Sequence, residues 1–500
     1  VDVTTGKSLE TGKILQDSLK ATKILQNLGI KKGDIISIIS ENSLTYCIPE
    51  LAAFYMGVTV QLLNPLYSTG ELKHALAISK PKLIICSQLS VKNVRQTLQE
   101  LNFEDKRIVL FEGTSENCSN IASFKDLLHN TDFIDPEFFN PETFDGSEQG
   151  ALILMSSGTT GLSKGVLITH ENIRAAFDHM LSEEYTGLKK SDVTVFILPF
   201  FHIFGVLVQI HSISVGFRLV LLRNFQPNMF LESVQNYKPR LLFLVPPILV
   251  FLAKSPLVNY YDITSVKDII VGGAPIASQL HVDATERMPN LSIRQLYGLT
   301  EIGGAATSTR KNKIKIGSAG VLIPHMSAKV WDSDLKKAVR PLKVGELCFK
   351  GPAVMKGYVG SESDTNLCMD EEGFFHTGDL GFFDEDGYFY IVDRIKELIK
   401  YKGYQVSPAE LEALILTHPS VKDCGVIGIP DEKAGEAPLA YVVKQSDTDV
   451  TEHDIINYVA ERISAGKHLH GGVRFIDEIP KTASGKILHR KLLEVFNVSL

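Results

Sequence analysis

Short apolar runs alternate with amphipathic stretches through most of the chain. In its first part, strand-like runs at 58–63, 82–86 and 108–111 are separated by helical stretches near 70–79 and 91–101. This alternation predicts a mostly parallel sheet with helices on its faces, because parallel strands need a crossover connection that is usually a helix. Ligands of such sheets bind beyond the carboxyl ends of the strands.

The alternation resumes after a polar, irregular passage at 113–150, with strands expected at 193–198, 218–222, 241–245, 268–271 and 292–297. From about 314 to 390 the pattern changes to short β-runs with glycine turns, which is typical of a small barrel-like subdomain. Residues 397–500 then indicate a compact α+β unit with helices near 408–417 and 452–464. Because 500 residues exceed what one core usually serves, at least two domains are expected. The predicted fold is α/β, a large N-terminal domain of αβ-layered sheets with a small β-barrel subdomain, hinged to a smaller α+β C-terminal domain.

The composition is that of an ordinary globular protein, with 44% hydrophobic and 22% charged residues. The net charge of -7 argues against a broad nucleic-acid-binding surface. Six cysteines without a CxxC pair favour reduced thiols inside a cell over disulfides or a zinc site. No apolar run reaches the roughly 18 to 20 residues of a membrane span, and no signal peptide is expected. Val498-Ser499-Leu500 lacks the basic middle residue of the peroxisomal Ser-Lys-Leu signal, so we expect either peroxisome or cytoplasm.

A loop rich in glycine and hydroxyl groups separates two apolar runs, at 151–155 and 166–168. Glycine lets the backbone approach a ligand, N–H groups and hydroxyls form a concavity suited to an anion, and a lysine adds a point charge for phosphate. The candidate phosphate-binding residues are Ser156, Ser157, Gly158, Thr159, Thr160 and Lys164. A Walker A loop is disfavoured, because Ser163 precedes the lysine and Gly165 follows it. A polar hairpin with a surface lysine is the structural alternative.

Four further motifs follow this loop in order, namely Tyr297-Gly298-Leu299-Thr300-Glu301, His376-Thr377-Gly378-Asp379, Val392-Asp393-Arg394-Ile395-Lys396 and Pro480-Lys481-Thr482-Ala483-Ser484-Gly485-Lys486. Together the motifs resemble the adenylate-forming superfamily, which includes acyl-CoA synthetases, 4-coumarate–CoA ligases and insect luciferases. The resemblance covers nearly the whole chain and fits the ligase and luciferase branch best. It implies a large AMP-binding domain at 1–393, with the β-rich subdomain at about 314–390, a hinge at 394–396 and a mobile C-terminal domain at 397–500.

The reaction implied by this resemblance has two steps. A carboxylate attacks the α-phosphate of ATP, pyrophosphate leaves, and a thiol, usually that of CoA, then takes the acyl group from the acyl-adenylate. The protein must align the two anions and neutralise the charge that builds on the phosphates. The resemblance assigns the β- and γ-phosphates to the loop at 156–164, the α-phosphate to Thr300 and Mg²⁺ to Glu301. A single carboxylate is a normal protein share of a Mg²⁺ site, although a Thr-Glu pair is also common at a helix N-terminus.

The residues that the resemblance assigns to AMP are Asp379 and Arg394 at the ribose, Tyr297 and Ile391 at the adenine, and Gly273 and Ala274 beside the base. Structural alternatives exist for these positions. Asp379 ends a turn-like sequence, and Gly273-Ala274 precedes Pro275 at an expected strand-to-helix turn.

Lys486 would bridge the substrate carboxylate and the α-phosphate during adenylation, where a cation lowers the repulsion between two anions. Its alternative is a solvated lysine in a mobile loop, in which Ala483 replaces the usual proline of the family. A swing of the C-terminal domain about the hinge would withdraw this lysine and bring in the opposite face. The residues expected on that face are Lys396, Lys400, Lys402 and Gly403, with Lys400 at the acyl-adenylate and the Lys402-Gly403 pair at CoA. The alternative for them is a solvated basic turn.

The acyl pocket implied by the resemblance is lined by His202, Phe204, Val208, Val271, Gly272, Gly298, Gly304 and Ala305. His202 would stand at its mouth and gate the approach of the thiol, whereas a lone histidine among aromatic residues is more often structural. Phe201 and Val208 stand where luciferases carry polar partners. An unpaired polar group costs roughly 1–3 kcal/mol when buried, so an apolar pocket favours a medium- or long-chain fatty acid. A hydroxycinnamate-like acid, a luciferase activity and a non-catalytic binding protein are the alternatives.

Overall fold

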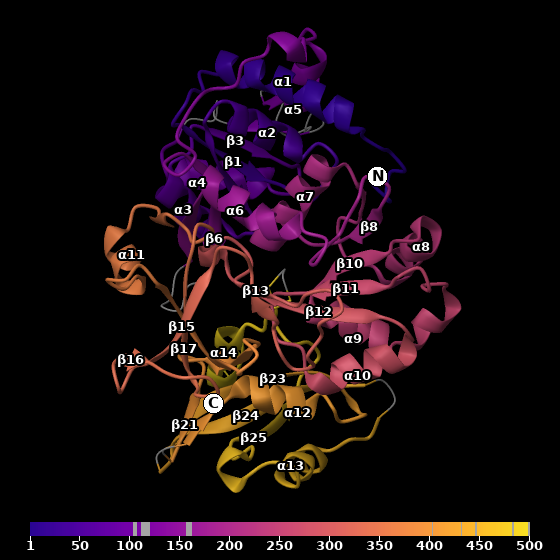
Figure 1. Cartoon of the computed structure of the whole chain (residues 1–500), viewed down its shortest axis with the longest axis vertical. Helices are drawn as coiled ribbons and strands as arrows, with labels where there is room; N and C mark the ends of the chain where they lie inside the picture. Colours follow the sequence, from indigo (N-terminus) through magenta and orange to yellow (C-terminus); the bar gives the residue numbers. More distant parts are fainter. Residues whose placement is uncertain are drawn as a thin grey trace.

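The computed structural model describes residues 1–103, 108–111, 121–156, 163–402, 404–431, 433–445, 448–482 and 485–498. A large N-terminal part and a small C-terminal part succeed one another along the longest axis of the molecule (Figure 1). Buried side chains form one large core within 21–389 and a separate core within 399–473. The α/β fold class with a large domain followed by a small one is confirmed.

The first sheet has eight strands in the order β18-β7-β6-β2-β1-β3-β4-β5. The strands are β1 Ile35–Ile39, β2 Thr59–Leu63, β3 Leu83–Cys86, β4 Ile108–Leu110, β5 Ala122–Ser123, β6 Gly150–Ser156, β7 Lys164–Thr169 and β18 Gly357–Tyr358. The strands from β6 to β5 pair in parallel, as the alternation predicts, whereas β7 and β18 are antiparallel. The parallel strands are apolar on both faces because helices cover both. Ile38 packs with α1 (Thr11–Asn27) and α2 (Cys47–Tyr55), while Ile39 packs with α3 (Thr69–Ser79) and α4 (Val91–Glu100).

The passage at 113–150, expected to be irregular, contains regular structure in its described part. Besides β5 it holds α5 (Phe124–His129) and the short 3₁₀ helix Pro136–Phe138. Ser123 caps α5 by accepting a hydrogen bond of 3.3 Å from the N–H of Asp126. A six-residue helix is too short to show a helical period in the sequence, so it is the packing of α5 that determines its conformation.

The second sheet follows the order β10-β11-β12-β13-β14, and β8 and β9 pair separately. The strands are β8 Val193–Phe196, β9 Arg218–Leu221, β10 Leu241–Leu244, β11 Asp268–Val271, β12 Ser292–Tyr297, β13 Thr307–Ser308 and β14 Val321–Leu322. The helix α6 His170–Met180 precedes them, and between them lie α7 Ile203–Val215, α8 Pro227–Tyr237, α9 Pro246–Lys254 and α10 Ser278–Arg287, with 3₁₀ turns at Pro256–Tyr260 and Thr300–Ile302. Since β10, β11 and β12 are parallel, their carboxyl ends lie at one edge of the sheet.

The segment expected to form a small barrel contains an antiparallel sheet in the order β16-β15-β17-β19-β20, so β16 and β20 are its edges. The strands are β15 Ser327–Asp332, β16 Lys337–Ala338, β17 Gly345–Lys350, β19 Phe375–Phe383 and β20 Phe389–Arg394, with α11 Glu362–Cys368 between β18 and β19. The pairing of β19 with β20 sets Asp379 opposite Arg394.

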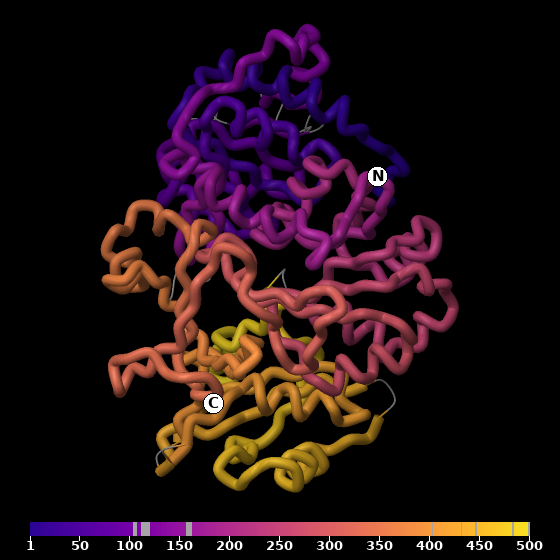
Figure 2. Tube along the Cα trace, in the orientation of Figure 1, coloured from indigo at the N-terminus to yellow at the C-terminus, as the bar shows by residue number. Residues whose placement is uncertain are grey.

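The C-terminal part is a sheet in the order β22-β21-β24-β23, with β25 beside β24. Its elements are β21 Ile399–Tyr401, β22 Tyr404–Val406, α12 Pro408–Ile415, β23 Val421–Asp431, β24 Gly435–Lys444, α13 Glu452–Ala460, a 3₁₀ turn Ala465–Lys467, β25 Gly472–Phe475 and α14 His489–Val498. Figure 2 follows the chain from orange into this yellow part. The two parts touch where Lys254 donates a 2.9 Å hydrogen bond to the carbonyl of Leu416, and where Asp393 accepts one from Ser407. Within the described ranges, no helix combines the length and the apolar character needed to cross a bilayer.

Candidate active site

A cavity of about 1170 Å³ lies where the carboxyl ends of β6 and β12 face the β19–β20 hairpin and the C-terminal part. Its wall includes Ser156, Glu301 and Arg394 from the large part, and Lys486 from the small one. Residues far apart in the sequence therefore meet around one space, as expected of ligands bound beyond strand ends.

Glu301 forms the floor of one corner of this cavity. It follows β12 in the 3₁₀ turn Thr300–Ile302 and is only 6% exposed. The hydroxyl of Ser156 donates to its Oε1 at 2.5 Å, and the hydroxyl of Tyr358 donates to the same oxygen at 3.1 Å. Among the described residues no lysine, arginine or histidine forms an ion pair with this carboxylate. A buried carboxylate held by hydroxyl groups, with an oxygen left for a ligand, fits the one-carboxylate share of a Mg²⁺ site.

Lys164 stands beside this corner as the first residue of β7. Its ammonium lies 3.0 Å from Asp364 and 4.8 Å above the ring of Tyr358. The bond to Lys164 lowers the pKa of Asp364, which keeps that carboxyl ionised. Lys164 therefore has a carboxylate partner at the cavity wall, and its assignment to a phosphate stays a prediction. The other predicted phosphate residues, Ser157, Gly158, Thr159 and Thr160, lie outside the described residues, while Thr300 lines the cavity.

Asp379 lies in β19 and is 4% exposed. Tyr297 donates a 2.7 Å hydrogen bond to its Oδ2, and the Nε of Arg394 lies 3.1 Å from its Oδ1. Burial raises the pKa of Asp379, while the charge of Arg394 opposes the rise. Ile391 packs against the large core, and neither it nor Ala274 is part of the cavity wall, in contrast to Gly273.

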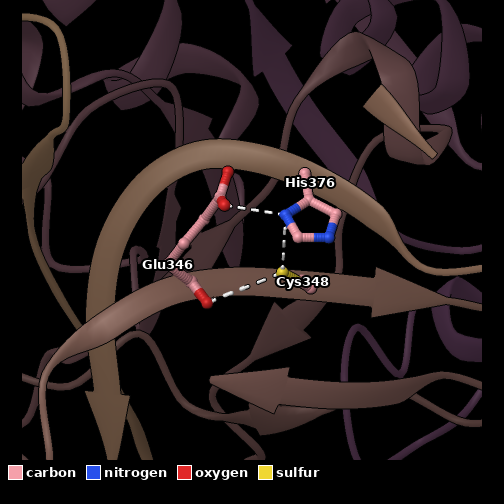
Figure 3. Close-up of side chains that lie close together, drawn as sticks. All are labelled: Glu346, Cys348 and His376. Atoms are coloured by element: carbon pink, nitrogen blue, oxygen red, sulfur yellow. Dashed lines mark hydrogen bonds and ion pairs between the residues drawn. The ribbon is translucent and has the colours of Figure 1, made fainter. Parts of the chain in front are cut away.

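The turn that carries Asp379 is held by Glu346 and His376, which also line the cavity and which Figure 3 shows together with Cys348. Glu346 accepts a 2.7 Å bond from Nδ1 of His376 through one oxygen and a 2.9 Å bond from the N–H of Gly378 through the other. The bond to Glu346 raises the pKa of His376. The ligand atoms of the three side chains lie within 4.8 Å of one another, a spacing compatible with a metal ion. Since both Glu346 oxygens already accept hydrogen bonds, the geometry supports a bracing role for the 376–379 turn.

Lys486 reaches the cavity from the C-terminal part, with its ammonium 3.8 Å from Oε1 of Glu397. Burial and the charge of Arg394 lower the pKa of Lys486. Lys396 also lines the cavity.

Two lysines expected to share in the second step lie elsewhere. Lys400 is exposed on β21, where its N–H bonds to Glu436 at 2.8 Å, and the Lys402 ammonium lies 5.3 Å from the ring of Tyr401. Neither is part of the cavity wall, and Gly403 lies outside the described residues. The structure thus brings Lys486 to the site and keeps Lys400 and Lys402 away from it.

His202 lines the cavity at the start of α7. Its Nδ1 accepts a 3.3 Å hydrogen bond from the N–H of Phe204, and burial lowers its pKa to about 4. The ring is therefore neutral at pH 7, with its proton on Nε2. A neutral histidine at this place can donate to a carboxylate oxygen.

The expected acyl-pocket residues divide into two groups. Phe204, Gly298, Gly304 and Ala305 line the cavity. Val208 and Val271 do not, because both are fully buried in the large core. Gly272 is not part of the wall itself, but a β-carbon there would lie 2.6 Å from Leu296, which lines the cavity. The packing therefore sets Val208 and Val271 behind the wall, while the assignment of Gly272 stays a prediction.

Polar residues that the sequence did not single out complete this region, namely His179, Tyr185, Thr186 and Ser308. Nδ1 of His179 donates to the carbonyl of Ala176 at 3.2 Å, and burial lowers its pKa to about 4. The proton therefore stays on Nδ1, and Nε2 keeps a lone pair for a ligand in the cavity. The amphipathic pattern of α6 could place His179 on a helix but not on a cavity wall.

Two family models match this chain, one in its large N-terminal part and one in its small C-terminal part. Residues 3–359 match the AMP-binding enzyme family and residues 410–486 match the AMP-binding enzyme C-terminal domain. The fold and the cavity are therefore those of the adenylate-forming enzymes, and the chain belongs to the AMP-binding enzyme family. Within it, the chain falls in the branch of luciferases and 4-coumarate–CoA ligases.

Two relatives and one solved structure illustrate this placement. Luciferin 4-monooxygenase of Nipponoluciola cruciata is 40% identical over 98% of this chain and 90% of its own length. A probable 4-coumarate–CoA ligase of Dictyostelium discoideum is 36% identical over 95% of this chain and 88% of its own. The crystal structure of ATP-bound MatB from Rhodopseudomonas palustris superposes with a TM-score of 0.85, at 25% identity, over 97% of this chain and 93% of that one.

Proposed function

We propose that the chain is an ATP-dependent acid–CoA ligase that acts through an acyl-adenylate. The single observation that carries this is the entry of Lys486 into a cavity lined by Glu301 and Arg394, with Asp379 held 3.1 Å from the guanidinium of Arg394. A cation, a metal-binding carboxylate and a sugar-binding carboxylate are what adenylation of a carboxylic acid requires of a protein.

Different residues of the cavity would serve different parts of acyl-adenylate formation. Asp379, held by Tyr297 and Arg394, binds the ribose hydroxyls, and Lys164 with Thr300 binds the phosphates. Lys486 lies between the acid and the α-phosphate, so that one carboxylate oxygen attacks phosphorus and pyrophosphate leaves. Glu301 would hold Mg²⁺, which when bound neutralises phosphate charge.

In the second step the CoA thiolate attacks the acyl carbon and AMP leaves as the mixed anhydride breaks. The groups expected to serve this step, Lys400 and Lys402, are exposed in the present arrangement. Rotation of 397–500 about a hinge at 394–396 would bring them in and withdraw Lys486. The domain boundaries at 1–393 and 397–500 form part of this proposal.

The acid is an aromatic acid with a hydrogen-bond donor at its distal end, of the hydroxycinnamate kind. The lone pair of His179 and the hydroxyl of Ser308 support this class, because they would be left unpaired beside an alkyl chain, whereas the hydroxyl of Tyr185 already accepts a 3.4 Å hydrogen bond from Arg310. Relatives named for luciferin and 4-coumarate point the same way. A medium- or long-chain fatty acid is the second candidate, favoured by the apolar wall of Phe204, Leu207 and Leu296.

A pyrophosphate-release screen over hydroxycinnamic, fatty and luciferin acids, with Mg-ATP and with or without CoA, tests the proposal. We expect acid-dependent pyrophosphate, AMP and a CoA thioester with hydroxycinnamic acids. Light from luciferin and oxygen without CoA would identify a luciferase instead. Failure of every acid to form an adenylate would refute the proposed function.

A further inference from the structure

A histidine bridges two carboxylates directly behind Lys486. His489 is the first residue of α14, Glu412 lies in α12 and Glu397 precedes β21. Nε2 of His489 lies 2.8 Å from Oε1 of Glu412, and Nδ1 lies 3.3 Å from Oε2 of Glu397. The three side chains are shielded from solvent, with 18%, 11% and 28% of their surfaces exposed for His489, Glu412 and Glu397.

The bridge fixes the charges of its members. Burial alone would lower the pKa of His489, but its contacts with Glu397 and Glu412 raise it to about 10. Burial would likewise raise the pKa of Glu397, but His489 and Lys486 lower it to about 2. At neutral pH a cation therefore separates two carboxylates, one of which also faces Lys486.

The shared carboxylate determines what Lys486 can do. Its ammonium lies 3.8 Å from Oε1 of Glu397, longer than the 2.6 Å contacts of tight lysine pairs such as Lys315 with Asp384. The two oxygens of Glu397 face different cations, with Oε2 3.3 Å from His489 and Oε1 3.8 Å from Lys486, so Lys486 makes no close ion pair with this carboxylate. From the large part it is faced by Asp379, Arg394 and Glu301, the groups around the reacting phosphate.

We propose that His489 is a positioning residue, which acts through Glu397 to hold the Lys486 ammonium free for acyl-adenylate formation. This inference rests on the proposed function for its catalytic consequence. Glu397, Glu412, Lys486 and His489 all belong to 397–500, so the bridge would move with Lys486 when that part rotates. Its loss should therefore impair the first step and leave the second intact.

The test compares the two half-reactions in His489→Gln, His489→Arg and the exposed control His453→Gln. We expect His489→Gln to slow acid-dependent pyrophosphate release by about 10- to 100-fold, with thioester formation from supplied acyl-adenylate within twofold of the parent. An arginine can satisfy two carboxylates, so His489→Arg should restore most of the first step. Equal loss in both steps, normal pyrophosphate release in folded His489→Gln, or no rescue by arginine would overturn the inference.

A second measurement does not depend on activity. Without the bridge, Glu397 would pair closely with Lys486 and keep it protonated, so labelling of Lys486 by an amine-reactive ester should be several-fold slower in His489→Gln. Mass spectrometry of the labelled peptide gives the rate, and an unchanged rate contradicts the inference. If thermal melting shows that His489→Gln does not fold, Glu397→Gln replaces it, with faster labelling of Lys486 expected because the charge of Glu397 no longer raises the pKa of the lysine; an unchanged rate contradicts the inference. A parent protein that releases no pyrophosphate refutes the proposed function alone, since the labelling comparison still decides the role of His489.

Discussion

The Ser156 hydroxyl lies 2.5 Å from Oε1 of Glu301, so the end of β6 and the turn after β12 meet at one corner of the cavity. Glu301→Gln keeps the shape of this contact and removes the charge. We expect acid-dependent pyrophosphate release to fall by about 100-fold or more, with a higher Mg²⁺ concentration needed for half-maximal rate. Tyr358→Phe removes only a hydroxyl donor from the same oxygen and is the control. Unaltered Mg²⁺ dependence in Glu301→Gln would remove Glu301 from the metal site.

Lys486→Ala removes the cation between the two reacting anions. Pyrophosphate release should fall by about 100-fold or more, whereas thioester formation from supplied acyl-adenylate should be spared. Single-turnover assays of both half-reactions measure the difference. Lys422→Ala, at an exposed lysine of β23, is the matched control. Equal loss of both steps would argue against the hinge assignment.

Lys400→Ala should show the reverse behaviour. Lys400 is exposed on β21 and distant from the cavity wall, so adenylation should proceed as in the parent protein. Thioester formation from the adenylate should slow by about tenfold or more, because a cation near the acyl group is lost. Normal CoA-dependent turnover would exclude Lys400 from the second site.

His179→Leu replaces the proposed acceptor at the cavity wall with an apolar group. For a hydroxycinnamic acid, kcat/KM should fall roughly 5- to 100-fold, the range of a lost buried hydrogen bond. The same acid without its hydroxyl serves as the matched control and should be little affected. An equal fall in kcat/KM for both acids would show that His179 does not form a hydrogen bond with the hydroxyl of the acid.

Glu50 makes the stability of the large part depend on pH. It is fully buried in α2, neither carboxylate oxygen has a hydrogen-bond partner among the described residues, and burial raises its pKa from 4.5 to about 8. Above about pH 4.5 the carboxyl of Glu50 loses its proton in the unfolded state but keeps it in the folded state. The contribution of Glu50 to the free energy of unfolding is therefore fully present at low pH and is lost as the pH rises through about 8.

Glu50→Gln removes this dependence and should be more stable than the parent at pH 8, by about 3–5 kcal/mol. The two proteins should converge towards pH 5. Denaturant unfolding between pH 5 and 8 measures the difference, with the exposed Glu286→Gln as control. A constant difference across this range would contradict a protonated Glu50.

The sequence predicted the parallel strands well because their apolar runs are long and lie between helical stretches. It missed β21, β22 and β25, since polar residues or glycine interrupt these short strands and leave no continuous apolar run. Motifs placed Ser156, Glu301, Arg394 and Lys486, which all line one cavity, and Asp379, which pairs with Arg394 at 3.1 Å.

The pocket wall was harder to predict than the motifs. Val208 and Val271 were assigned to it, but which side of an element faces the ligand depends on packing between distant segments, and both side chains lie in the core. His179 was missed for the same reason, because only the packing of α6 against the rest of the large part turns its ring towards the cavity.

One section of the cavity wall admits no side chain. A β-carbon at Gly298 would stand 1.6 Å from the carbonyl oxygen of Gly304, so the backbone of the connection between β12 and β13 would have to move to accept it. Laboratory selection for new acids should accordingly leave position 298 untouched and accumulate replacements along α6 and α7 instead. Changes in the range of acids accepted would therefore come from side chains on these helices, while Gly298 would remain glycine.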